Sequence, residues 1–120
     1  MTFHGFLPSE RVAPLYRQAH LLLHSSRYES QAVVVGEAAA AGLPSVGTAV
    51  GVLAELAPAA AVAVPAGDAP ALAEAALALL HDPVRRERIG LAAQAWARAH
   101  DADWTAARFE AIYQQVVRGA

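Results

Sequence analysis

The sequence predicts an α/β fold in which helices flank a parallel β-sheet. Short apolar runs of strand length alternate with longer segments of helical pattern along most of the chain. This alternation is typical of parallel sheets, because each helix returns the chain to the start of the next strand. The chain has 120 residues, of which 56% are hydrophobic, so residues 1–120 are expected to form a single domain with a well-buried core.

The first third of the chain reads as strand, helix, strand and helix. Residues 1–7 (MTFHGFL) predict a short strand, and residues 8–19 (PSERVAPLYRQA) have helical character. The compact apolar run at 20–25 (HLLLHS) predicts a second strand, closed by the loop SRYES. Alanines favour a helix from about 32 to 41, and Gly42, followed by Leu-Pro, is a typical helix stop.

The middle of the chain predicts two further strands. Residues 44–48 (PSVGT) are strand-like and lead into residues 49–56 (AVGVLAEL), which are interpreted as a glycine-containing turn. Residues 61–65 (AVAVP) predict the last strand, which ends at the proline.

The remainder of the chain is helical. Asp68 and Asp82 are suitable N-caps for two successive helices, with proline tolerated in the first turn of each. Asp103 or Thr105 is expected to open the final helix. Its apolar residues recur with a spacing that forms one stripe along the helix: Phe109, Ile112, Tyr113, Val116 and Val117.

Composition excludes several functions. The net charge is −2 and the nine basic residues, all arginine, are scattered, so neither nucleic acid nor an anionic membrane surface is an expected partner. The absence of cysteine excludes disulfides, thiolate metal sites and cysteine catalysis. No secretory signal or membrane span is recognised, so a cytoplasmic protein is expected. The alanine-rich, lysine-free composition predicts a bacterial source.

Two glutamates are the best candidates for function. Glu29 lies in the loop after the second predicted strand, and Glu37 lies in the helix that follows. Ligands of parallel sheets bind beyond the carboxyl ends of the strands, where a helix N-terminus favours phosphate. Carboxylates suit hydroxyl groups instead, for example a vicinal diol. A nucleotide sugar is a ligand that has both phosphate and hydroxyl groups. The alternative is that neither acid binds a ligand, Glu29 being a solvated loop residue and Glu37 a residue that caps the helix or forms a pair at its surface.

Residues 25–56 resemble the donor-binding segment of the group 1 retaining glycosyltransferases, which have the GT-B fold. The hallmark is a pair of glutamates separated by seven residues, then an alanine-rich turn, Gly-x-Pro, a strand and a glycine-containing loop that ends in glutamate. The flanking segments 3–29, 64–89 and 101–116 are also similar to the family. The matching positions here are Glu29, Glu37, Ala38 to Ala41, Gly42, Pro44, Gly51 and Glu55.

The resemblance implies a role for each residue and a Rossmann-like sheet from the C-terminal domain of a GT-B protein. Glu37 would accept hydrogen bonds from the ribose, and Glu29, the catalytic candidate, would contact the transferred sugar near its reacting carbon. Backbone amides of Ala32, Val33 and Val34 would bind the diphosphate. Glu55 would order its turn. No metal or cofactor is implied, the donor substrate being a nucleotide diphosphate sugar.

The matched region corresponds to the back two-thirds of a donor-binding domain. The acceptor domain is not included, so the chain is expected to be inactive alone and to self-associate through an exposed sheet edge or a swapped element. Gln31, Ala32 and Val52 differ from the usual family residues. They favour an alternative, a degenerate non-catalytic domain for oligomerisation or protein binding. A simple nucleotide-binding domain is a third possibility.

Other polar and aromatic residues have simpler interpretations. His20 and His24 are expected on one face of a strand, without a third metal ligand. Ser25 lies at a strand end without a catalytic constellation. Trp96 and Trp104 lie in helical patterns and are expected in the core.

Overall fold

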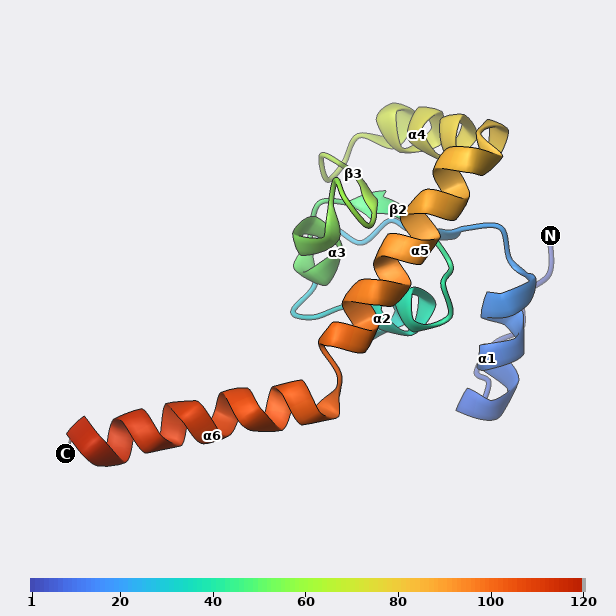
Figure 1. Cartoon of the computed structure of the whole chain (residues 1–120). Coiled ribbons are helices and arrows are strands. Elements are labelled where there is room, and N and C mark those ends of the chain that lie inside the picture. The colour runs from blue at the N-terminus through green and yellow to red at the C-terminus, as the bar shows by residue number, and fades with distance from the viewer. Residues whose placement is uncertain (120) are drawn as a thin grey trace.

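The computed structural model of the chain describes residues 1–119. Figure 1 shows a small sheet surrounded by helices, with one long helix leading away from the body. The elements, in chain order, are α1 (Ser9–Gln18), β1 (Leu22–His24), α2 (Val33–Ala40), β2 (Ser45–Thr48), α3 (Gly51–Leu56), β3 (Val62–Val64), α4 (Ala69–His81), α5 (Pro83–Ala99) and α6 (Ala102–Gly119).

The sheet is parallel, with strand order β1-β2-β3. His24 is paired with Gly47, and Gly47 with Ala63, so the three strands end at a common edge. The predicted α/β fold is therefore confirmed. Among residues 1–119, β1 has a strand neighbour only on its β2 side, and Leu23 on it is 54% exposed.

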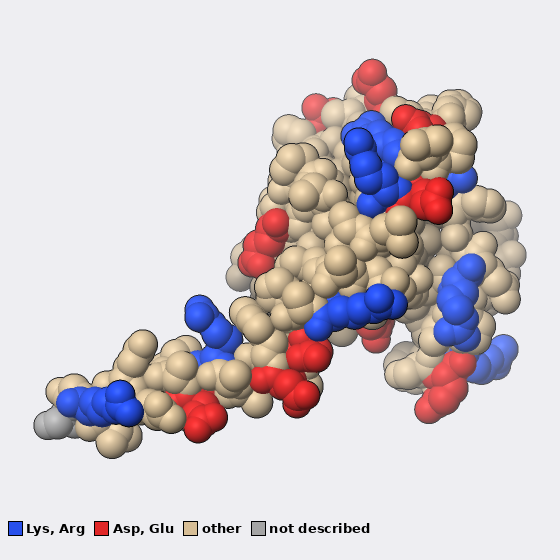
Figure 2. All heavy atoms as spheres, viewed as in Figure 1, with Lys and Arg blue, Asp and Glu red and all other residues tan. Residues whose placement is uncertain are grey.

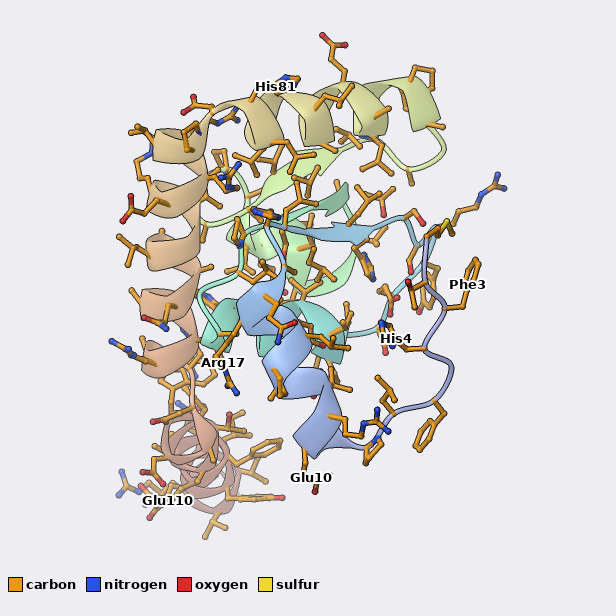
Figure 3. The ribbon with its side chains drawn as sticks, turned by 90° about the vertical axis from the view of Figure 1, so that its right-hand side faces the viewer. Phe3, His4, Glu10, Arg17, His81 and Glu110 are labelled. Atoms are coloured by element: carbon orange, nitrogen blue, oxygen red, sulfur yellow. The ribbon has the colours of Figure 1, made fainter. Side chains whose placement is uncertain are left out.

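The strand predicted at residues 1–7 is wrong. The segment has no regular secondary structure, and the Phe3 and Phe6 side chains are exposed. Figure 3 shows Phe3 on this extended segment, pointing outward. A strand forms only where a neighbour pairs with its backbone groups, and no described residue offers one there.

The helices cover both faces of the sheet. Adjacent residues of a strand point to opposite faces. Val46 accordingly packs with Leu79 of α4 and Ile89 of α5 on one face, whereas a side chain at Gly47 would meet Leu53 of α3 on the other. A second cluster between α2, α3 and α5 completes the core.

The turn predicted at residues 49–56 is partly wrong, because Gly51–Leu56 forms the helix α3. Leu53 and Leu56 lie three residues apart, on one face of that helix, and both are buried. Their burial favours a helical turn over the loop suggested by the local glycine. By contrast, Gly42 ends α2 as predicted, with φ +73°, and the amide of Leu43 donates to the carbonyl of Ala38 over 2.9 Å.

The caps of the later helices are largely as predicted. The Asp68 carboxylate accepts from the amide of Ala71 at 2.9 Å, and Asp82 accepts from that of Arg85 at 2.8 Å. The final helix differs from the prediction, because it begins at Ala102 and not at Asp103 or Thr105. Asp101 provides the cap, accepting from the amide of Trp104 at 2.9 Å.

The final helix α6 projects from the domain (Figure 1). The radius of gyration is 16.2 Å, whereas a compact chain of this length has about 13.6 Å. The apolar stripe of α6 is exposed, with fractions from 52% to 76% for its five residues. Trp96 packs against the core as expected, but Trp104 is 44% exposed, so its predicted core position is wrong. No helix within residues 1–119 is long and apolar enough to cross a membrane.

Candidate functional site

Glu29 lies in the loop that follows β1, at the carboxyl edge of the sheet, and its side chain is 28% exposed. The Ser26 hydroxyl donates to Glu29 Oε1 at 2.7 Å, and His24 Nε2 lies 3.1 Å from the same oxygen. The hydrogen bond from Ser26, which is the largest cause, and the smaller contribution of the hydrogen bond to His24 lower the pKa of the Glu29 carboxyl from its ordinary value. Glu29 is therefore held as a carboxylate.

Two neighbouring elements fix the loop that carries Glu29. Thr48 Oγ1, at the end of β2, donates to the backbone oxygen of Ser26. The amide of Val52 lies 3.4 Å from the carbonyl oxygen of Gln31. The start of α3 is also close, since a Cβ at Gly51 would lie 3.1 Å from Glu29 Cβ. Sheet and α3 together set the position of the carboxylate.

The N-terminus of α2 follows this loop directly. Its N-cap, Ala32, is left-handed, with φ 60°, and makes no side-chain cap. The first amides of a helix have no partner within the helix, and the Val33 side chain is 66% exposed. The Val34 side chain is partly buried against the core. The result is a helix terminus that favours an anion.

Glu37 lies in the second turn of α2 and is exposed. Its Oε2 accepts a hydrogen bond of 2.8 Å from the Tyr16 hydroxyl of α1. Burial, and then the bond to Glu37, raise the pKa of Tyr16 to about 12. The tyrosine is thus a permanent donor at neutral pH, and it orients the carboxylate.

A cavity of about 390 Å³ joins part of the predicted site. It is lined by Ala32, Val33 and Glu37 together with residues of α5, but neither Glu29 nor Val34 contributes to its wall. The structure thus brings the helix terminus and Glu37 to one surface. Glu29 lies in the loop that precedes α2, outside the wall of this cavity. Its role as a ligand of the sugar donor therefore stays a prediction.

A neighbouring cavity of about 510 Å³ contains Glu55, Trp96 and Trp104. Glu55 is exposed, and no hydrogen bond to another residue of the described part of the chain holds its carboxylate; its predicted role in ordering the turn is not supported by such a contact. The His100 ring lies between the two tryptophans: it stacks on Trp96, with ring centroids 4.7 Å apart, and it is tilted by 60° against Trp104, with centroids 4.6 Å apart. This group of three aromatic rings was not predicted from the sequence, because the turn between α5 and α6 brings Trp104 next to the rings at the end of α5.

The surface charge is mixed. Figure 2 shows acidic and basic side chains interspersed on the visible face, without a large field of one sign. Within residues 1–119, no three histidine, cysteine, aspartate or glutamate side chains are grouped as metal ligands. His20 lies before β1, whereas His24 is buried within it, so the two do not share a strand face as predicted.

Three site residues were missed by sequence reasoning: Tyr16, His24 and Ser26. Tyr16 lies 21 residues before its partner Glu37, and no local pattern links them. A signal did exist for His24, a polar residue at the end of an otherwise aliphatic strand. Such a residue is rarely buried without a partner.

The fold and these residues define an α/β domain with an anion-favouring helix terminus and two carboxylates at the carboxyl edge of its sheet. The family model described as glycosyl transferases group 1 matches residues 1–82, and the chain belongs to this family. A solved structure of sucrose-phosphate synthase from Thermosynechococcus elongatus is similar, with a TM-score of 0.86 and 30% sequence identity. The similarity covers 99% of this chain but only 31% of that one. No curated protein matches in a sequence search.

These comparisons confirm the predicted family and identify the α/β domain as part of a GT-B fold. The chain therefore spans only 31% of the length of the synthase. The roles of Glu29, Glu37 and the amides of Ala32, Val33 and Val34 stay predictions.

Proposed function

We propose that this chain is the donor-binding portion of a retaining glycosyltransferase that uses a nucleotide diphosphate sugar. One observation carries the proposal: an uncapped helix N-terminus follows one anchored carboxylate and precedes another. Phosphate suits the helix terminus, and hydroxyl groups suit the carboxylates. No ligand that is only an anion would explain two acids beside an anion-binding terminus.

Each carboxylate keeps one oxygen for a ligand. The two donors to Glu29 use Oε1, and Tyr16 uses Oε2 of Glu37; within residues 1–119, no hydrogen bond is found at the remaining oxygen of either. We assign the free oxygen of Glu37 to the ribose and that of Glu29 to the transferred sugar. The diphosphate binds the amides of residues 32–34. The reaction requires no metal or cofactor from this chain.

Transfer itself needs a second half of the active site. The chain is inactive alone in this proposal, because the residues that bind the acceptor lie outside its 120 positions. This is consistent with the 31% share of the synthase that it covers. The setting we propose is the bacterial cytoplasm, where nucleotide sugars are available.

Calorimetric titration with UDP, GDP, ADP and their hexose conjugates tests donor binding. We expect saturable binding to one nucleotide series, abolished by Glu37→Ala. Glu110→Ala, on the projecting helix α6 (Figures 1 and 3), is the matched control and should bind as the unmodified chain does. Absence of binding at millimolar ligand by a folded chain contradicts the proposal, and so does full binding by Glu37→Ala.

The alternative, a non-catalytic oligomerisation module, is favoured by the exposed apolar surface. Among residues 1–119, the outer edge of β1 has no strand neighbour, and Leu23 and the stripe of α6 are both exposed. Sedimentation velocity separates the two functions: a stable oligomer that does not bind nucleotide supports the alternative, and a chain that binds nucleotide does not.

A further inference from the structure

We propose that His24 is a positioning residue, which acts with Ser26 to fix one oxygen of Glu29 and leave the other oriented toward a bound sugar. The inference rests on the proposed function for the identity of the ligand. The hydrogen-bonded arrangement of the three side chains does not depend on it.

The geometry is asymmetric about the carboxylate. Ser26 Oγ lies 2.7 Å and His24 Nε2 lies 3.1 Å from Oε1 of Glu29. Ser26 Oγ is 3.4 Å from His24 Nε2, so the three groups form a closed triangle. Two donors on one oxygen fix the rotation of the carboxylate and leave Oε2 for a hydroxyl group.

The tautomer of His24 follows from its two nitrogens. Nδ1 is buried and has no hydrogen-bond partner among the described residues. A proton on Nδ1 would therefore be an unsatisfied buried donor, and it would leave the Nε2 lone pair facing Oε1. We assign the neutral Nε2–H form, in which His24 donates to Glu29 and Nδ1 keeps only a lone pair.

Burial supports a functional reason for histidine at this position. His24 is 8% exposed, and the other residues of β1 are leucines. An aliphatic side chain would fill the site without burying an unpartnered nitrogen. The backbone of His24 is also closely packed against the neighbouring strand. Its strand partner is Gly47, and a Cβ added at position 47 would clash with the backbone oxygen of His24. A rigid strand end is a suitable support for a positioning residue.

Three variants test the arrangement. His24→Leu removes the donor but suits a buried strand, His24→Gln restores an N–H donor, and Ser26→Ala removes the second donor. His20→Leu makes the same replacement at an exposed histidine just before β1 and is the control. Circular dichroism and urea denaturation establish that each variant is folded.

The first readout is the titration of the Glu29 side-chain carboxyl, followed by carbon-detected NMR. Because Ser26 is the largest cause of the low pKa, we expect Ser26→Ala to raise the pKa most, His24→Leu to raise it less, and His24→Gln and His20→Leu to leave it nearly unchanged. An unchanged Glu29 titration in folded His24→Leu would overturn the proposal, whether or not the chain binds nucleotide.

The second readout is the ratio of the Kd of the preferred nucleoside diphosphate to that of its hexose conjugate. We expect His24→Leu to lower this ratio about tenfold, the equivalent of one hydrogen bond to a charged group, and His24→Gln to restore it. A merely structural role would change both Kd values together, and that result would overturn the positioning role. If the unmodified chain binds no nucleotide, the proposed function fails, and the carboxyl titration alone decides whether His24 anchors Glu29.

Discussion

Replacement of Gly47 by alanine tests the packing of the sheet that supports the site. A Cβ at this position would meet the backbone oxygen of His24, and it would lie 2.8 Å from Leu53 Cδ1 and 3.0 Å from His24 Cβ. The first of these atoms belongs to the strand paired with Gly47, so relief requires the strands to separate. Overpacking of a core typically costs about 1–3 kcal/mol, and for Gly47→Ala we expect a loss of about 3 kcal/mol in the free energy of unfolding. This is a large fraction of the stability of a typical domain, about 5–15 kcal/mol.

The assay is urea denaturation followed by circular dichroism, with Gly36→Ala as the matched control. Gly36 lies inside α2, and a Cβ there meets nothing within 4 Å. The control should therefore gain about 0.5–1 kcal/mol, because alanine favours helix over glycine. A loss below about 1 kcal/mol for Gly47→Ala, with an unchanged denaturant slope, would refute this account of the sheet.

Three further predictions concern stability and association. The pKa of Tyr16 is raised from 10.0 to about 12, so its contribution to stability is complete below pH 10 and is lost as the pH rises through 12. The unmodified chain should lose more stability over that interval than Tyr16→Phe in urea denaturation, and equal losses would contradict the role of Glu37 as its acceptor. Leu79→Ala should cost about 2–5 kcal/mol in the same assay, since Leu79 is 0% exposed, and a cost near zero would exclude it from the core. Ile112→Asp on α6 should change stability by less than about 0.5 kcal/mol yet reduce self-association in sedimentation velocity; unchanged association would show that the stripe is not the contact.

Most of the fold could be predicted because its signals are local. The short strand-like runs that became β1, β2 and β3, the stop at Gly42 and the caps at Asp68 and Asp82 are all encoded within a few residues. The errors are tertiary in origin. Residues 1–7 have strand-like composition but no partner strand among the described residues, and α3 is helical because Leu53 and Leu56 are buried together.

The site was predictable only in part. The spacing of Glu29 and Glu37, together with the family resemblance, indicated the two acids and the helix terminus between them. The residues that hold the acids were not evident. Tyr16 reaches Glu37 from another helix, and His24 reaches Glu29 from a strand. Such contacts depend on how elements pack, which a single sequence does not state.

The central claim is that the N-terminus of α2 binds the diphosphate of a sugar donor. Backbone amide NMR during titration with the nucleoside diphosphate preferred in calorimetry tests it most directly. The account predicts that the largest saturable shifts occur at the amides of Ala32, Val33 and Val34. Saturable shifts centred elsewhere, with these three amides unchanged, would contradict it.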